Sequence, residues 1–308
     1  MQPLHVETPL WESLPLSAAL GAPAYLKMEA FQPVGSFKAR GMGAACRAAQ
    51  AAGAQQLVCA SGGNAGYAVA YAGRVLGIPT TIVVPQSTSP FMRDRIRAEK
   101  ATVVVHGDSW DDAHAHAVQL AREAGAASIH PFDDPEVWRG HAPMVHEIAA
   151  TGVVPGAIVV SVGGGGLLIG LLQGMHEVGW TRVPVLAVET KGAASFAASV
   201  QTGHLVTLDR IDSIATTLGA RTVAAAALAW THQHPITPYT VTDRAAVNAC
   251  RRFAEDHRVL VEPACGASLS TVYDRVAPLA GHSPVVVIVC GGAGVSPSLL
   301  REWEQTAS

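Results

Sequence analysis

The apolar residues of this chain form short continuous runs that are rich in β-branched side chains. Between most of these runs lie Ala-rich stretches that are long enough for helices. Continuous apolar strands that alternate with helices indicate parallel sheets covered by helices on both faces. In such an α/β fold the carboxyl ends of the strands meet at one edge, where ligands bind. The strands are expected at residues 56–60, 80–85, 101–106, 157–162, 183–189 and 284–290, and the helices at residues 39–52, 65–76, 111–124 and 167–178.

Three glycine-rich loops each follow one of the apolar strands. They cover residues 61–66 (Ser-Gly-Gly-Asn-Ala-Gly), 163–166 (four glycines) and 290–294 (Cys-Gly-Gly-Ala-Gly). Glycines turn tight corners anywhere, but three such loops at strand ends favour a shared anionic ligand. In the second loop, backbone N–H groups can approach a ligand closely, and the positive end of the following helix attracts an anion. We expect a phosphate there.

A nicotinamide-dinucleotide site is the main alternative for this loop. Glu189 ends the next strand, roughly where a ribose-binding acid is expected. The glycine spacing argues against it. If Gly164 and Gly166 are the first two glycines of the dinucleotide motif, the third position is Ile169, and a glycine comes one residue later at Gly170. No Lys-Ser/Thr pair follows the loop, so it is not a P-loop either, and a single phosphate fits it better than a pyrophosphate.

Composition and charge narrow the class of partner. The 308 residues are 49% hydrophobic and 15% charged, which supports a large buried core. A net charge of −3 without a basic run argues against nucleic acid, and no apolar stretch is long enough to span a membrane. The N-terminus lacks the pattern of a signal peptide, and the five cysteines show no CxxC spacing. We therefore expect reduced thiols in a cytoplasmic protein, and we expect no zinc site because the histidines lack metal-ligand spacing.

Lysine is scarce in this chain, which has only four. Lys27, Lys100 and Lys191 have ordinary polar surroundings, whereas Lys38 follows Ser36-Phe37 at the start of a predicted helix. The positive end of a helix weakens the ammonium form of a lysine, and an amine nucleophile needs such help. Taken alone, however, a solvated surface lysine explains Lys38 better than a catalytic amine does.

Taken together, three segments resemble the signatures of fold type II pyridoxal-phosphate enzymes. They are Ser36-Phe37-Lys38, the loop at residues 61–66 and the stretch from Gly163 to Leu167. Within that group the similarity is to the serine/threonine dehydratase (serine dehydratase-like) family, and it runs from about Thr8 to Cys290. Three further segments carry the same resemblance: residues 131–135 (Pro-Phe-Asp-Asp-Pro), residues 262–267 (Glu-Pro-Ala-Cys-Gly-Ala) and residues 289–292 (Val-Cys-Gly-Gly).

The resemblance implies the architecture. Family members have a fold like that of the tryptophan synthase β subunit, with two open, mostly parallel sheets and helices on both faces. By this similarity, residues 1–34 and 133–308 form a large cofactor-binding domain, and residues 35–132 form a small mobile domain. A homodimer is expected on the same grounds.

The resemblance also implies a role for each site residue. Lys38 is expected to carry pyridoxal 5′-phosphate as a Schiff base and to act as the catalytic base. Phe37 would lie against the pyridine ring, Asn64 would bond its 3′-oxygen, and Cys290 would face its nitrogen. The phosphate is expected at Gly163, Gly164, Gly165, Gly166 and Leu167, the substrate carboxylate at Ser61, Gly62, Gly63, Asn64 and Ala65, and a monovalent cation such as potassium at Gly163, Glu189, Ala193, Ser195, Leu218 and Ala220.

The implied activity is elimination of water from L-serine or L-threonine, which gives pyruvate or 2-oxobutyrate and ammonia. A cysteine, with an ordinary pKa of about 8.5, protonates the ring nitrogen poorly, which favours loss of the β-substituent over transamination. Gly62 is expected to leave room near the substrate and to lower the rate. The alternatives are a β-replacement enzyme or racemase of the same fold, a nicotinamide-dependent oxidoreductase and a non-catalytic ligand-binding protein.

Overall fold

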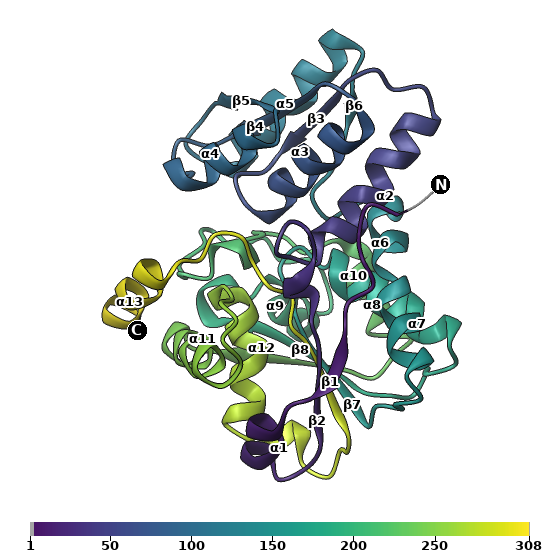
Figure 1. Cartoon of the computed structure of the whole chain (residues 1–308), viewed down its shortest axis with the longest axis vertical. Coiled ribbons are helices and arrows are strands. Elements are labelled where there is room, and N and C mark those ends of the chain that lie inside the picture. The colour runs from purple at the N-terminus through teal and green to yellow at the C-terminus, as the bar shows by residue number, and fades with distance from the viewer. Residues whose placement is uncertain (1–2, 308) are drawn as a thin grey trace. The chain divides into compact units, whose positions relative to one another are not determined.

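The structure is a computed structural model that describes residues 3–307, and the chain divides into two compact units (Figure 1). Unit 1 comprises Met1–Val6 and Gln32–His141, and unit 2 comprises Glu7–Phe31 and Ala142–Ser308. Each unit contains one sheet, with four strands in unit 1 and six strands in unit 2.

Unit 1 is built on a wholly parallel sheet in the strand order β5-β4-β3-β6. Alternate residues of its strands pack into two separate hydrophobic cores, one on each face of the sheet. Leu57 and Cys59 pack with the helices α2 and α3, whereas Val58 and Ala60 pack against α5. The strands are β3 (Leu57–Ala60), β4 (Thr80–Val84), β5 (Thr102–Val105) and β6 (Ala127–Ser128), and the helices are α2 (Lys38–Ala51), α3 (Asn64–Leu76), α4 (Pro90–Ala98), α5 (Trp110–Ala124) and α6 (Pro135–His141).

Unit 2 is built on the sheet β1-β2-β10-β7-β8-β9, in which only β1 runs antiparallel to its neighbour. The central strands β7 and β10 are buried along their whole length. The strands are β1 (Leu10–Glu12), β2 (Ala24–Lys27), β7 (Ala157–Ser161), β8 (Val185–Thr190), β9 (Ile236–Val241) and β10 (Val285–Ile288).

Helices lie on both sides of this second sheet. In Figure 1, α1, α11 and α12 lie on one side, and α7 and α8 lie on the other. The helices are α1 (Leu14–Leu20), α7 (Pro143–Ala150), α8 (Gly166–Glu177), α9 (Ser195–Thr202), α10 (Ala225–Trp230), α11 (Asp243–His257), α12 (Pro263–Tyr273) and α13 (Pro297–Thr306), and the 3-10 turns are Glu29–Phe31, Lys191–Ala193, Thr216–Leu218 and Ala277–Leu279.

The predicted fold class is confirmed, since two mostly parallel sheets are flanked by helices. The compact units do not coincide at every boundary with the domains expected from the resemblance, because residues 3–6, 32–34 and 133–141 belong to unit 1. The mobility of residues 35–132 stays a prediction. None of the described helices is long and apolar enough to cross a membrane.

Candidate active site

Lys38 is the first residue of α2 and is half-buried. Its Nζ donates a hydrogen bond to the Pro131 carbonyl at 2.6 Å and lies 5.2 Å from the centroid of the Phe37 ring. The Phe37 ring also contacts the buried ring of His141, with 5.1 Å between ring centroids. A lysine held between a backbone carbonyl and an aromatic ring is an oriented amine and not a solvated surface side chain.

The loop after β3 forms a close turn into α3. Asn64 begins this helix and is 9% exposed, and Ser61 Oγ accepts a hydrogen bond from the Gly63 N–H at 3.3 Å. A Cβ built on Gly66 would lie 2.0 Å from the Ser61 carbonyl oxygen, so only glycine allows this approach. The loop therefore holds its backbone in a fixed conformation at the end of the strand.

The sequence predicted free space beside Gly62, but the structure shows none. A Cβ at this position would lie 2.1 Å from Thr88 Oγ1 and 2.8 Å from Thr88 Cγ2. The volume beside Gly62 is therefore already filled by the threonine. Sequence reasoning missed Thr88, which lies in a turn before α4, far along the chain from the loop that it contacts.

The four-glycine loop connects β7 to α8, whose first residue is Gly166. Gly165 has φ of +90°, and its Cβ would lie 2.8 Å from the Ala227 Cβ. The Gly164 carbonyl accepts a hydrogen bond from the Ala224 N–H at 3.0 Å, which fixes the loop against the segment before α10. A side chain at Gly165 would therefore collide with its neighbours, and no side chain caps the first N–H groups of α8.

The N-termini of the helices differ in how their first N–H groups are paired. A Ser or Thr side chain caps α1, α4, α5, α11 and α13, whereas α2, α3 and α8 have no side-chain cap. The helices α7, α10 and α12 also lack one, so a missing cap does not by itself mark a site. At α8, however, the uncapped N–H groups follow a glycine loop and no acid occupies the first turn. This combination fits a phosphate.

Cys290 follows β10 and is buried beside Cys265. A hydrogen bond with Cys265, burial and the nearby Glu262 charge together hold the pKa of the Cys290 thiol well above its usual range. The thiol is therefore neutral at physiological pH, and it can offer a weak hydrogen bond but no negative charge.

The residues expected to bind a cation all belong to unit 2. Gly163 follows β7 and Glu189 lies within β8, which is the neighbouring strand, and Gly163 lies against Leu218. Glu189 is fully buried, and its carboxylate accepts hydrogen bonds from the N–H groups of Phe196 and Ala197 at 2.9 and 2.8 Å. Burial raises the pKa of Glu189 to about 7, although these two hydrogen bonds oppose the shift.

Ser195, at the start of α9, has a buried Oγ without a hydrogen-bond partner among the described residues. An unpaired buried hydroxyl beside a buried carboxylate is suited to a cation that prefers oxygen ligands. Within residues 3–307 there is no cluster of three or more His, Cys, Asp or Glu side chains that could hold a metal ion. Hydroxyl and backbone oxygens would therefore have to provide most of the ligands.

The predicted site residues are divided between the two units. Phe37, Lys38 and residues 61–65 belong to unit 1, whereas the four-glycine loop, the cation residues and Cys290 belong to unit 2. No pattern in the sequence indicates which backbone carbonyl accepts the hydrogen bond from Lys38, because every residue carries a carbonyl.

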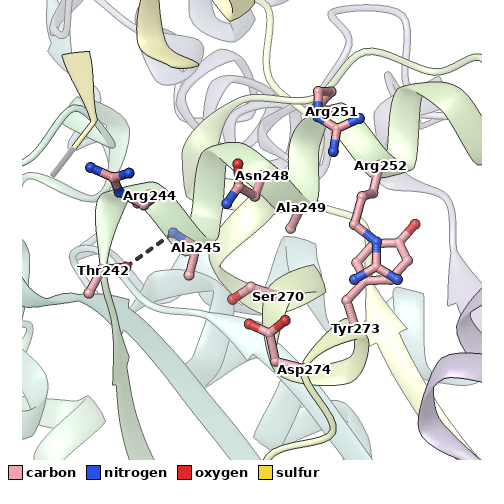
Figure 2. Close-up of a pocket in the computed structure, with 10 residues that line it drawn as sticks. All are labelled: Thr242, Arg244, Ala245, Asn248, Ala249, Arg251, Arg252, Ser270, Tyr273 and Asp274. Atoms are coloured by element: carbon pink, nitrogen blue, oxygen red, sulfur yellow. Dashed lines mark hydrogen bonds between the residues drawn. The ribbon is translucent and has the colours of Figure 1, made fainter. Parts of the chain in front are cut away.

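A pocket of about 360 Å³ lies in unit 2 beside α11 and α12, and Figure 2 shows the side chains that line it. Arg252 lies over the ring of Tyr273, with 4.0 Å between the guanidinium carbon and the ring centroid. None of the predicted site residues lines this pocket, whose lining residues are Thr242, Arg244, Ala245, Asn248, Ala249, Arg251, Arg252, Ser270, Tyr273 and Asp274.

Comparison with known proteins agrees with this chemistry. Residues 1–291 match the family model described as "Pyridoxal-phosphate dependent enzyme". The mouse protein "L-serine dehydratase/L-threonine deaminase" is 48% identical over 311 residues, which cover 97% of this chain and 94% of that protein. The human "Serine dehydratase-like" protein is 48% identical over 309 residues, which cover 97% of this chain and 94% of that protein.

Solved structures show the same relationship. A fungal L-serine ammonia-lyase from Rhizomucor miehei superposes with a TM-score of 0.94 at 39% identity, with all of both chains covered. Threonine deaminase isoform 2 from Solanum lycopersicum superposes with a TM-score of 0.88 at 28% identity, with 98% of this chain and 83% of that chain covered. The nicotinamide-dinucleotide alternative finds no support in these matches. The chain belongs to the pyridoxal-phosphate dependent enzyme family.

Proposed function

We infer that this protein is a pyridoxal-phosphate-dependent dehydratase (ammonia-lyase) that eliminates water from L-serine, L-threonine or both. The products are pyruvate or 2-oxobutyrate and ammonia. The observation that carries this function is the oriented amine of Lys38, in a chain that is 48% identical to the mouse serine dehydratase/threonine deaminase over nearly its full length.

The residues present are suited to the cofactor. The uncapped start of α8, which follows a loop without room for side chains, is suited to the phosphate group. Lys38 provides the amine for a Schiff base, Phe37 provides an aromatic face, and Asn64 provides an amide for the 3′-oxygen. Cys290 provides a neutral thiol for the ring nitrogen.

When bound, pyridoxal phosphate supplies an electron sink for the negative charge that develops at the substrate Cα. Lys38 would hold the cofactor through its amine, and the same amine would remove the proton from Cα. The Pro131 carbonyl orients this amine by accepting one of its N–H groups. The backbone N–H groups of residues 61–65 bind the substrate carboxylate. The Cα hydrogen and the β-hydroxyl together make up the water that is lost, and hydrolysis then releases the 2-oxo acid and ammonium.

The neutral Cys290 favours this outcome. A charged acid at the ring nitrogen would hold it protonated and would stabilise the carbanion for longer, which favours transamination. A neutral thiol does not, so loss of the β-hydroxyl is favoured instead.

We also propose that a monovalent cation such as potassium binds at Gly163, Glu189, Ala193, Ser195, Leu218 and Ala220. The buried acid and the unpaired Ser195 hydroxyl support this proposal. Potassium would be expected to raise activity relative to a matched buffer that contains a large organic cation. A homodimer in the cytoplasm is the expected assembly and location, and sedimentation equilibrium tests the assembly.

The decisive experiment compares the purified protein with its Lys38→Ala variant. The unsubstituted protein should show the visible absorbance band of lysine-bound cofactor, lose it on borohydride reduction, and release 2-oxo acid from L-serine or L-threonine. Lys38→Ala should lose the reducible band and the activity, whereas Lys100→Ala, which changes an exposed lysine of the same unit, should keep both. A colourless protein that cannot be reconstituted with pyridoxal phosphate would overturn the function.

Racemisation is the second candidate, because a maize serine racemase superposes with a TM-score of 0.90 at 25% identity, with 99% of this chain and 93% of that chain covered. Chiral analysis of unreacted serine separates the two activities. Formation of D-serine faster than pyruvate would favour the racemase.

A further inference from the structure

The turn that presents the Pro131 carbonyl to Lys38 is organised by a histidine. Residues 130–133 follow β6 in unit 1, and His130 Nδ1 accepts hydrogen bonds from the Asp133 N–H at 2.8 Å and the Phe132 N–H at 3.3 Å. Two donors on one ring nitrogen require that this nitrogen carries no proton. His130 must therefore be neutral, with its proton on Nε2.

Aromatic rings surround His130 and keep it neutral. Its ring meets those of Phe132, His114 and Trp110 edge to face, with centroid distances of 4.7, 5.2 and 6.0 Å. Burial and, to a smaller extent, the charges of His114 and Lys38 lower the pKa of His130 to about 4. Asp133 is the acid on the same turn. The neutral acceptor form of His130 therefore predominates above about pH 4.

Two tryptophan side chains form hydrogen bonds to backbone carbonyls in and near the turn. The Trp110 indole N–H donates to the Ala60 carbonyl at 2.9 Å, at the strand end that leads into the loop at 61–66. The Trp138 indole N–H donates to the Phe132 carbonyl at 2.7 Å. Pro131 itself is buried and has no N–H, so its carbonyl is the polar backbone group that it can offer.

These contacts form a short path from the histidine to the reactive amine. His130 accepts hydrogen bonds from the N–H groups of the two residues after Pro131. The Pro131 carbonyl belongs to the same peptide unit as the first of these N–H groups and accepts a hydrogen bond from Lys38 Nζ at 2.6 Å. Movement of the turn would change the direction in which the amine points. Misplacement of a catalytic group by about 1 Å costs on the order of 100-fold in rate.

We propose that His130 is a positioning residue, which fixes the 130–133 turn so that the Pro131 carbonyl aims the Lys38 amine at the substrate Cα proton. The role rests on the proposed function, because it requires Lys38 to act as the base. His130 touches neither the substrate nor the cofactor in this proposal and acts only through the turn.

The test compares two replacements of His130 in the holoenzyme. His130→Leu keeps an apolar side chain of similar bulk but removes the acceptor, whereas His130→Asn places a carbonyl oxygen near the position of Nδ1. For His130→Leu we expect kcat to fall about tenfold to 100-fold, with KM changed less than about threefold. The primary isotope effect on kcat with α-deuterated serine should rise, because proton removal becomes slower. His130→Asn should recover kcat to within about threefold.

The control is His114→Leu, which removes a ring of the same aromatic cluster but no hydrogen bond of the turn. It should leave kcat within about threefold and the isotope effect unchanged. A His130→Leu enzyme with unchanged kcat and isotope effect, or an Asn variant as impaired as the Leu variant, would overturn the proposal. If His130→Leu does not fold, His130→Gln takes its place, because the longer glutamine side chain moves the acceptor oxygen away from the position of Nδ1. The Gln variant should then be less active than the Asn variant, and equal activity of the two would refute the role.

Failure of the proposed function would look different. It would appear in the unsubstituted protein, as absence of 2-oxo acid from serine and threonine. The positioning role would then be measured by exchange of the alanine Cα proton in deuterated water, which requires only a bound cofactor and a correctly aimed Lys38. Equal exchange rates for the unsubstituted protein and His130→Leu would reject the role on its own.

Discussion

The shape of the four-glycine loop makes a quantitative prediction for Gly165→Ala. The backbone at this position has φ of +90°, and an added Cβ would lie 2.8 Å from the Ala227 Cβ and 2.9 Å from Val223 Cγ2. A left-handed conformation costs a residue with a side chain about 1–2 kcal/mol. Crowding against two buried neighbours adds about 1–3 kcal/mol. The expected loss in the free energy of unfolding is therefore about 2–5 kcal/mol.

Gly179→Ala is a matched control in the same unit. Gly179 has φ of +82°, follows the end of α8 and is exposed, and no atom lies within 4 Å of its added Cβ. Only the cost of the conformation, about 1–2 kcal/mol, applies there. The difference between the two variants thus isolates the crowding at Gly165.

Urea unfolding of the cofactor-free proteins measures these costs without a contribution from ligand binding. Pyridoxal-phosphate titration should then show affinity lowered about tenfold or more for Gly165→Ala, because N–H bonds to a charged group contribute about 1.5–3 kcal/mol each. Gly179→Ala should keep its affinity. If both variants unfold within about 0.5 kcal/mol of each other and bind the cofactor equally, the reasoning about this loop is wrong.

Three further changes test the buried acid, the substrate loop and the thiols. Folding in potassium-free buffer favours protonated Glu189, so the free energy of unfolding should there fall by up to about 3 kcal/mol as the pH rises from the ordinary pKa of 4.5 to about 7, and then stay level. Glu189→Gln should remove this slope in urea titrations, and a retained slope would contradict the assignment. Gly62→Ala should lower kcat/KM for serine about tenfold or more, because its Cβ collides with Thr88, and Gly62→Ala/Thr88→Ala should recover part of it. A thiol reagent at about pH 8 should modify none of the five buried cysteines in the native protein and all five after denaturation. Burial raises the pKa of Cys59 to about 12, and a hydrogen bond with Cys265 together with burial raises the pKa of Cys290 well above its usual range.

The sequence predicted the central strands well because their two faces are both buried. The run at residues 157–162 is found as β7, Ala157–Ser161, and all five of its residues are buried. The strand β9, Ile236–Val241, was not predicted, because it lies at the edge of its sheet, is only partly buried and contains Pro238. Edge strands lack the continuous apolar pattern, and β6 has only two residues.

The candidate site was predictable to a similar, limited extent. Glycine loops at strand ends pointed to an anion, but the role of Lys38 depended on the resemblance, because local sequence favoured a surface lysine. The Pro131 carbonyl and the Thr88 side chain could not be predicted. A backbone acceptor has no sequence signal, and contact between Gly62 and Thr88 depends on how two distant loops meet.

Changing the charge at residue 290 is the sharpest test of why elimination is favoured over transamination. Cys290→Ser replaces one neutral donor with another and should keep elimination dominant. Cys290→Asp introduces an acid into a buried site near Glu262, whose carboxylate already accepts hydrogen bonds from Thr217 Oγ1 and the Gly294 N–H at 2.9 and 2.5 Å. Two buried acids repel each other, so the free energy of unfolding of the cofactor-free variant should fall by about 3 kcal/mol or more.

The cofactor would relieve that repulsion if the new carboxylate paired with a protonated ring nitrogen. Binding of pyridoxal phosphate should then stabilise Cys290→Asp more than it stabilises Cys290→Ser. In a single turnover, the stronger electron sink should also shift the product of serine from pyruvate, formed by elimination, towards hydroxypyruvate, formed when the amino group passes to the cofactor. Chromatography of the 2-oxo acids measures this ratio. If both variants give the same ratio, the charge at residue 290 does not decide the reaction, and the choice must be made by the residues that hold the β-hydroxyl.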